Sequence, residues 1–258
     1  MIQERRRSII VGTALGVLIG LITAILVIAI TGLKSPVTVL PDFSTIGDVR
    51  AKKRAFIDFL LPIIERENLK ILNDRIRVKE IAVQVSEGKP ISKGTIKWVK
   101  RRAEKYGFPV PEEFSSELFT RLLTRVDIIP PSLTLAQAAN ESGWGGSRFA
   151  VAGNNLFGFW CHTPGCGIIP NSRVEGAPHE VKLYNDVSAC VEDYLRNLNK
   201  NRAYRELRSI RVLERKNDRI LSGYLLASGL LRYSSRGQAY VREIQSLIRA
   251  NGLAEYDI

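Results

Sequence analysis

The sequence predicts a mainly helical α+β protein with a small β-hairpin lobe, preceded by a helical N-terminal region and one transmembrane helix. Three observations support this prediction. Apolar residues recur at spacings of three and four through most of the chain, which is typical of amphipathic helices. Residues 143–185 are instead rich in Gly, Pro and Asn, with short β-like pieces. A long uncharged run lies near the N-terminus.

This N-terminal run predicts a membrane anchor. Arg5, Arg6 and Arg7 precede the uncharged run of residues 8–33. Its apolar core spans roughly 30 Å as a helix, which is the thickness of a bilayer core. A cleaved signal peptide has an apolar stretch of only ~7–15 residues and a small-residue cleavage site, and neither fits here. Because arginines stay on the cytoplasmic side, we expect a single-pass protein of the inner (cytoplasmic) membrane whose remainder lies in the periplasm.

The remainder divides into three predicted parts. Residues 35–48 contain two prolines and predict a short stem. Residues 49–126 predict a helical N-terminal region in which Pro62 kinks or divides the first helix. Residues 127–258 predict a second domain.

The second domain begins with a short predicted helix. This helix covers residues 132–142 and ends at Gly143, a residue suited to cap a helix C-terminus. The β-hairpin lobe follows it. Residues 186–250 are then helical again, with interruptions near Asn217 and Gly229.

Glu141, near the end of that short helix, is the candidate catalytic acid. Its neighbours Leu135, Ala138 and Ala139 are small or apolar, and Trp144 follows. Apolar surroundings and the negative end of a helix dipole both disfavour a charged carboxylate. A carboxyl group that stays protonated can donate its proton to a leaving oxygen.

The residues around Glu141 suggest a sugar-binding cleft. Gly143, Gly145 and Gly146 would leave the backbone open beside the carboxyl group. Four aromatic residues nearby could stack on sugar rings: Trp144, Phe157, Phe159 and Trp160. Taken singly, each of these residues is more simply a surface or core residue, and only their combination favours a catalytic site.

The string AQAANESGWGGSRFA, followed by NNLFG, resembles the signature of the glucosaminidase-type peptidoglycan hydrolases, glycoside hydrolase family 73. It is also similar to the broader signature of lysozymes and transglycosylases. The segments WCHTPGCGIIP, HEVKLYNDVSACVEDYLRNLNKNRAYRELR and LLRYSSRGQAYVREIQSLI resemble the Bax-like proteins of Gram-negative bacteria, as does the region from about Val49. The resemblance implies a lysozyme-like glucosaminidase domain over residues 127–258 that cleaves peptidoglycan glycan strands and needs no cofactor.

The resemblance also implies roles for single residues. Glu141 matches the general acid of the family. The family has a second acidic residue in its β lobe, for which Glu175 is the first candidate and Glu180 and Asp186 are the alternatives. It also has a late tyrosine, which Tyr233 matches.

A further set of residues is predicted to bind the substrate. They are Trp144, Asn155, Phe157, Trp160 and Tyr240, of which Tyr240 is also the alternative to Tyr233.

The cysteines predict no metal site. Cys161 and Cys166 are spaced for a disulfide around a Pro-Gly turn, and an exported domain permits one. Zinc is disfavoured because the chain lacks paired ligand motifs, even with His162 and His179 nearby. Cys190 predicts a buried free thiol.

The charge of +12 suggests an anionic partner, which could be nucleic acid, anionic lipid or an acidic polymer. For most of these charges, a solvated basic surface is the simpler interpretation. A nucleic-acid partner is disfavoured because the charge is spread out and no recognition motif is present. The polymer we expect is peptidoglycan, whose peptides carry carboxylates. A Ser-His-Asp hydrolase and a phosphate-loop enzyme are disfavoured by their missing motifs. A lytic transglycosylase, a muramidase and a non-catalytic glycan-binding scaffold remain alternatives, and the oligomeric state stays open.

Overall fold

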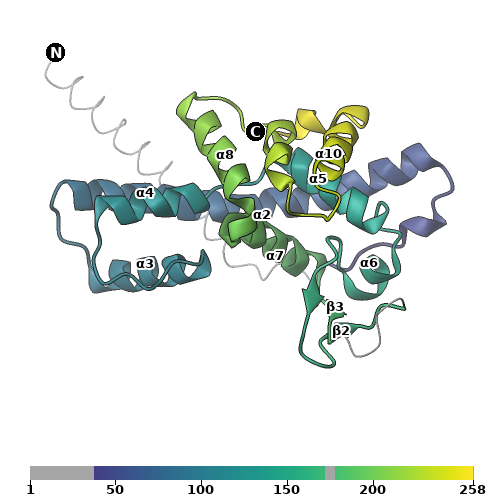
Figure 1. The fold of residues 1–258 in the computed structure, drawn as a ribbon, viewed down its shortest axis with the longest axis horizontal. Helices are drawn as coiled ribbons and strands as arrows, with labels where there is room; N and C mark the ends of the chain where they lie inside the picture. The colour runs from purple at the N-terminus through teal and green to yellow at the C-terminus, as the bar shows by residue number, and fades with distance from the viewer. Residues whose placement is uncertain (1–37, 172–177, 258) are drawn as a thin grey trace, which may run out of the picture. The chain divides into compact units, whose positions relative to one another are not determined.

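A computed structural model describes residues 38–171 and 178–257. This part of the chain is mostly helical with one small antiparallel sheet, which confirms the mainly helical α+β class predicted for it (Figure 1). The helices are η1 (Phe43–Thr45), α2 (Val49–Ser86), α3 (Lys93–Lys105), α4 (Ser116–Arg125), α5 (Pro131–Ser142), α6 (Arg148–Gly153), α7 (Val187–Lys200), η2 (Arg202–Tyr204), α8 (Arg205–Lys216), α9 (Gly223–Leu226), η3 (Ala227–Leu230), α10 (Gln238–Ala250) and η4 (Leu253–Tyr256). The strands are β1 (Trp160–Cys161), β2 (Gly167–Ile168) and β3 (Glu180–Lys182).

The predicted anchor, residues 1–34, lies outside the described residues, as does the candidate Glu175. Within residues 38–171 and 178–257, none of the helices combines the length and the apolar character that a membrane crossing requires. Residues 38–258 group into one compact unit. Helices from both sides of the boundary predicted between residues 126 and 127 pack within this one unit. The structure therefore shows no separation at this boundary, which stays a prediction.

Helix α2 runs through Pro62 without a break, so the expected division of this helix is wrong. Pro62 lies on the exposed face, and the carbonyl that loses its partner belongs to Asp58, whose side chain is 58% exposed. Water can therefore solvate that carbonyl. On the opposite face, Leu60 and Ile64 before and after the proline are both fully buried. Burial of that face on both sides of Pro62 stabilises a single helix.

The predicted stem packs on the domain from Thr38 onwards. Leu40 and Phe43 are buried, and Phe43 contacts the ring of Phe56 on α2 edge-on. The Leu40 amide donates to the Asn154 side chain at 3.1 Å, while the Thr38 carbonyl accepts from the Val187 amide at 2.8 Å. Apolar side chains within this Pro-containing segment account for the difference from a free stem.

A buried charge cluster fixes the entry to α5. Asp127 is buried and pairs with Arg215 on α8 at 3.0 Å and with Arg75 on α2 at 3.4 Å. Arg211, also on α8, is fully buried and donates to the backbone carbonyls of Asp127 and Ile128. These bonds tie α2 and α8 to the residues that precede α5.

Helix α5 is the central element of the described unit. It packs against α2, α9, α10 and η4, and its first nine residues are all buried. Its N-terminus lacks a side-chain cap from Pro130. The carboxylate of Asp257 supplies one instead, accepting from the backbone amide of Ser132 at 3.0 Å and from its hydroxyl at 2.7 Å. The C-terminal segment thereby fixes the helix that carries Glu141.

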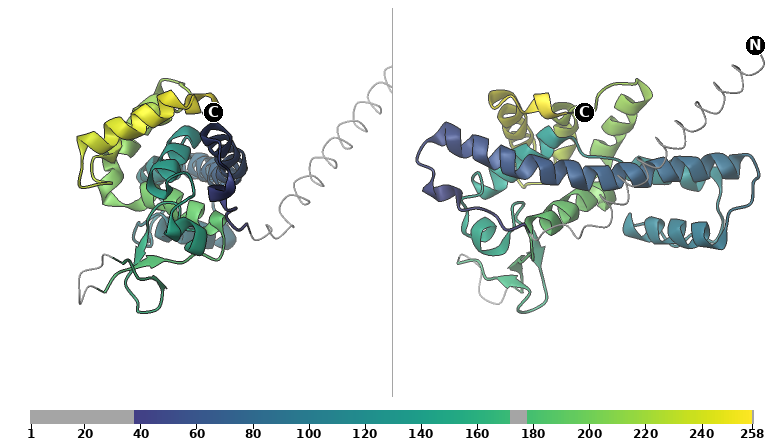
Figure 2. Two further views of the ribbon diagram at one scale, coloured as in Figure 1. Left: turned by 90° about the vertical axis from the view of Figure 1, so that its right-hand side faces the viewer. Right: turned by 180° about the vertical axis from the view of Figure 1, so that it is seen from behind.

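The β lobe lies on the opposite side of α5 from α10 (Figures 1 and 2). Its strand order is β1-β3-β2, and both pairings are antiparallel. The predicted lobe is therefore present, with a third strand added to the hairpin. Between α5 and the sheet, the short helix α6 was not predicted from the sequence. It begins at the N-cap Ser147, whose hydroxyl accepts from the Ala150 amide.

Candidate active site

Glu141 lies in the last turn of α5 and is partly exposed. The helix ends where expected, because Gly143 adopts the left-handed conformation (φ 59°) and its amide bonds to the Ala139 carbonyl. The preceding turns of α5 are buried. The carboxyl group of Glu141 is thus carried to the surface by a helix whose remainder is fixed in the core.

A chain of hydrogen bonds approaches this carboxyl group from the interior. The hydroxyl of Tyr194 donates to the Gln137 side chain at 2.6 Å. The Gln137 amide donates to the hydroxyl of Tyr240 at 2.8 Å, and that hydroxyl donates to Oε1 of Glu141 at 2.7 Å. Every donor in the chain points toward Glu141. Oε1 is consequently a hydrogen-bond acceptor.

The tyrosines in this chain stay neutral donors. Burial raises the pKa of Tyr194 well above its ordinary value. Burial, together with the adjacent Glu141 carboxyl group, raises the pKa of Tyr240. In the described part of the chain, no Lys or Arg nitrogen lies within 4.0 Å of the Glu141 carboxyl. The described partners of this carboxyl group are therefore neutral.

Tyr233 stacks on Tyr240 instead of bonding to Glu141. The two rings are 5.3 Å apart at an angle of 9°. The Tyr233 hydroxyl donates to the Phe157 carbonyl at 3.3 Å. The structure thus brings the alternative, Tyr240, to the carboxyl group. The role predicted for Tyr233 near the reacting bond stays a prediction.

The glycines after Glu141 have different surroundings. Gly143 is exposed, with open space where a side chain would lie. Gly145 is buried with φ 77°, and a Cβ there would come within 2.7 Å of the Phe43 ring. Gly146 is exposed too, although a Cβ there would come within 3.1 Å of the Lys52 ammonium. Gly143 therefore matches the open backbone expected beside the acid, whereas Gly145 permits the close approach of η1.

Trp144 packs toward α2. Its ring contacts Phe56 edge-on at 5.6 Å, and the Lys53 ammonium lies 4.9 Å from the ring centre. It remains partly exposed, so its predicted contact with sugar stays a prediction.

Asn155 and Phe157 support the site instead of presenting surface to a ligand. Asn155 is 2% exposed, and its amide nitrogen donates to the backbone carbonyls of Phe159 and Lys182. Phe157 is 3% exposed and stacks on Tyr194 at 4.0 Å. Direct substrate contact is therefore not the role that the structure gives these two residues. Asn155 connects the lobe to the loop after α6, and Phe157 backs the hydrogen-bond chain.

Trp160 is the exposed aromatic residue of the lobe. It lies on β1, is 59% exposed and stacks on His179 at 4.3 Å. A flat exposed ring of this kind suits the face of a sugar, and the contact of Trp160 with substrate stays a prediction.

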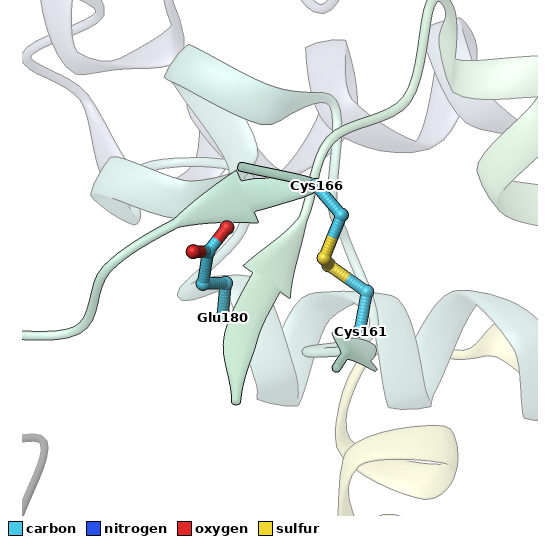
Figure 3. Close-up of side chains that lie close together, drawn as sticks. All are labelled: Cys161, Cys166 and Glu180. Atoms are coloured by element: carbon cyan, nitrogen blue, oxygen red, sulfur yellow. A yellow bond between two sulfur atoms is a disulfide. The ribbon is translucent and has the colours of Figure 1, made fainter. Parts of the chain in front are cut away.

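The lobe contains a disulfide between Cys161 and Cys166 (Figure 3). The carboxylate of Glu180 lies beside it and accepts from the backbone amides of Gly165 at 3.0 Å and Gly167 at 2.8 Å. In the described part of the chain these three side chains gather as potential metal ligands. Because the two sulfurs are bonded to each other and the carboxylate caps the loop, the group serves as a structural support.

This geometry separates the candidates for the second acid. Glu180 is occupied by the loop amides, and Asp186 caps α7 by accepting from the Ala189 amide at 2.7 Å. Both of these alternatives therefore have structural roles. Glu175 lies in the segment outside the described residues, so its role stays a prediction.

Two residues of the hydrogen-bond chain were missed from the sequence. Gln137 precedes Glu141 by four residues and so shares its helix face, which makes a polar residue in an otherwise apolar stretch a usable signal. Tyr194 lies on α7 and offers no comparable signal, because only the fold brings it to Gln137.

Comparisons with known proteins bear on the whole of this region. The sequence matches the glucosaminidase family, described as mannosyl-glycoprotein endo-beta-N-acetylglucosaminidase, over residues 116–253. It is 30% identical over 215 residues to Protein bax of Escherichia coli (strain K12), covering 82% of this chain and 74% of that protein. A structural similarity links it to the catalytic domain of the autolysin Auto from Listeria monocytogenes, with a TM-score of 0.42, 17% identity, and coverage of 83% of this chain and 92% of that chain. The family match includes the helix that carries Glu141.

Proposed function

Because the chain belongs to the glucosaminidase family, we propose that it is an endo-β-N-acetylglucosaminidase that cleaves the glycan strands of peptidoglycan, with Glu141 as the general acid. The observation that carries this proposal is the position of the Glu141 carboxyl group and its hydrogen bond from Tyr240. A neutral phenol holds Oε1 at 2.7 Å, and the group is partly exposed at the end of a buried helix. A carboxyl group with neutral partners can hold a proton and release it.

The reaction follows from this arrangement. Oε2 of Glu141 gives its proton to the glycosidic oxygen as the bond from that oxygen to the anomeric carbon breaks. The leaving sugar departs with a hydroxyl group, and a water molecule supplies the oxygen that bonds to the anomeric carbon. The proton of that water passes to a carboxylate of the β lobe, for which Glu175 is the proposed residue. In the alternative, the substrate's own acetamido oxygen first bonds to the anomeric carbon as the glycosidic bond breaks. Water then displaces that oxygen, and its proton returns to the Glu141 carboxylate.

The test is digestion of purified cell-wall sacculi by the wild-type chain and by Glu141→Gln. Glu80→Gln, an exposed carboxyl on α2, serves as the matched control. We expect wild type and control to release fragments with reducing N-acetylglucosamine ends, and Glu141→Gln to release almost none. Equal release by Glu141→Gln would overturn the assignment of the acid.

Mass spectrometry of the products tests which bond is cleaved. A reducing N-acetylmuramic acid end would show a muramidase, and an anhydro sugar a lytic transglycosylase. Either product would replace the proposed bond specificity. Binding to sacculi without any released sugar would show a glycan-binding scaffold.

The same proposal includes a location. The arginines at positions 5–7 and the apolar run after them support an anchor in the inner membrane with the enzyme domain outside the cytoplasm. The disulfide between Cys161 and Cys166 supports an oxidising compartment. Protease added to spheroplasts should remove the C-terminal domain, and the intact chain should resist extraction from membranes by salt. Protection from protease in intact spheroplasts would contradict the location.

A further inference from the structure

Seven basic side chains line two adjoining hollows on the face formed by α4, α7, η2 and α8. Two of them are paired, Arg121 with Glu117 at 4.0 Å and Arg196 with Asp193, and the other five are not. The hollows have volumes of about 580 Å³ and 380 Å³ and share Arg125. We call this surface the arginine groove and define it by Arg125, Lys200, Arg202, Arg205 and Arg208. Among the described residues, no carboxylate lies within 4.0 Å of any of these five cations. The groove is therefore a concentration of uncompensated positive charge.

The fold holds these cations together against their mutual repulsion. Arg125 is held by the backbone carbonyls of Tyr106 and Gly107, at 2.7 and 3.0 Å. Arg208 is held in the same way by the carbonyls of Leu198 and Asn201, both at 2.8 Å. Burial and the neighbouring guanidinium groups lower the pKa of both arginines, that of Arg208 to about 10. An anion in the groove would relieve this repulsion.

One acidic residue, Asp193, lines the groove, but its carboxylate is already paired with two other basic side chains. Asp193 accepts from Lys182 and from Arg196. It also accepts from the Tyr184 hydroxyl at 2.8 Å. It therefore leaves the charge of the five cations uncompensated.

The groove adjoins the candidate active site through two elements. Phe159 lines the larger hollow, and its ring lies 6.3 Å from that of Phe157, whose carbonyl accepts from Tyr233. In η2, Arg202 faces the hollow while Tyr204 lies 6.0 Å from the Tyr233 ring. Residues that line the groove therefore pack against residues that support the candidate active site.

We propose that the arginine groove binds the carboxylates of the peptides that branch from the glycan strand. This inference rests on the proposed function and names the part of the substrate that the groove recognises. Guanidinium groups match a carboxylate in plane and in donor spacing, which favours this anion. The groove would favour strands whose peptides are intact over strands from which they have been removed.

The experiment measures binding, with Glu141→Gln as the background so that strands are not consumed. The groove variant adds Lys200→Gln, Arg202→Gln and Arg205→Gln, all three exposed positions that make no described ion pair. The control variant instead adds Lys79→Gln, Arg50→Gln and Arg101→Gln, which remove the same charge from exposed positions elsewhere. Both use the full chain in detergent. The probes are fluorescent glycan strands with their peptides and the same strands after an amidase has removed them.

We expect the groove variant to bind peptide-bearing strands about tenfold more weakly than the background protein, since each exposed charge contributes modestly. The control variant should stay within about twofold, and peptide-free strands should bind all three proteins equally. Equal weakening on both probes, or none on either, would overturn the proposal. Phosphatidylglycerol vesicles are the third probe. If the groove variant loses binding to these vesicles while its binding to strands is unchanged, the groove binds lipid and the proposal is also overturned.

The outcomes also separate this inference from the proposed function. If wild type releases sugar from sacculi while the groove variant binds normally, only the groove proposal fails. If Glu141→Gln still releases sugar, the assignment of the acid fails. Binding of the strands with and without peptides still tests whether the groove recognises the peptide carboxylates.

Discussion

Asp127 lies in the bend before α5 and Glu141 in the last turn of α5, and the fold gives the two carboxyl groups opposite surroundings. Asp127 is buried and pairs with Arg75 and Arg215, and with Arg211 at 4.0 Å. Glu141 is partly exposed, and its closest described partner is the hydroxyl of Tyr240. Burial works against the charged form of Asp127, but the three arginines outweigh it and lower its pKa.

This difference matches the roles proposed for the two residues, structural for Asp127 and chemical for Glu141. A carboxylate surrounded by guanidinium groups is held in its charged form and cannot serve as a proton donor. A carboxyl group held by a neutral phenol keeps one oxygen free to carry a proton. The two residues should therefore respond differently to the loss of charge, one in stability and the other in rate.

Glu141→Gln should produce the largest change. We expect the rate on peptidoglycan to fall by about 10²- to 10⁴-fold, the usual contribution of a general acid. Stability should change by less than about 1 kcal/mol, because the amide oxygen can still accept from Tyr240. Turnover and urea unfolding of the same preparation measure the two effects. A stability loss as large as the activity loss would remove the distinction from Asp127.

Asp127→Asn should show the reverse pattern. Removing this charge leaves the buried guanidinium group of Arg211 without an opposite charge beside it. We therefore expect a loss of about 3–5 kcal/mol in the free energy of unfolding. Asp58→Asn is the matched control, because it breaks an exposed pair with Arg54 that should contribute less than about 1 kcal/mol. Activity per folded molecule should persist. An effect no larger than that of the control would show that the buried cluster does not fix the entry to α5.

Acid should weaken the Asp127 cluster at a defined place on the pH scale. The lowered pKa of Asp127 means that the folded protein binds this proton less tightly than the unfolded chain does. Its contribution is then complete above the unfolded value of about 4 and is lost as the pH falls through the lower folded value. Urea unfolding from neutral to acidic pH should therefore show wild type and Asp127→Asn converging below about pH 4. If the free energies of unfolding of the two proteins differ by the same amount at every pH, the pairing of Asp127 with the arginines would be contradicted.

The two regions also differ in how much of them the sequence could predict. The end of α5 at Gly143 followed from a glycine after a helical pattern, and Glu141 from its neighbours and its resemblance to the glucosaminidase family. The bond from Gln137 to Tyr240 joins residues 103 positions apart, and no local pattern encodes it. The Asp127 cluster likewise gathers arginines from α2 and α8. Helical periodicity predicts elements, whereas side-chain pairing between distant elements depends on the packing.

Tyr240→Phe should give the smallest of these effects and tests whether the phenol positions the acid. The substitution removes the donor to Glu141 and leaves the buried Gln137 amide without its acceptor, while the ring can still stack on Tyr233. We expect a loss of about 1–2 kcal/mol in stability and about tenfold in kcat with KM unchanged, since Glu141 would lose orientation rather than substrate affinity. Tyr224→Phe, a tyrosine on α9 beside Arg249, is the control and should change neither quantity. An unchanged kcat in Tyr240→Phe would mean that Glu141 is oriented by α5 alone, and that the hydrogen bond from Tyr240 contributes to folding but not to the proton transfer.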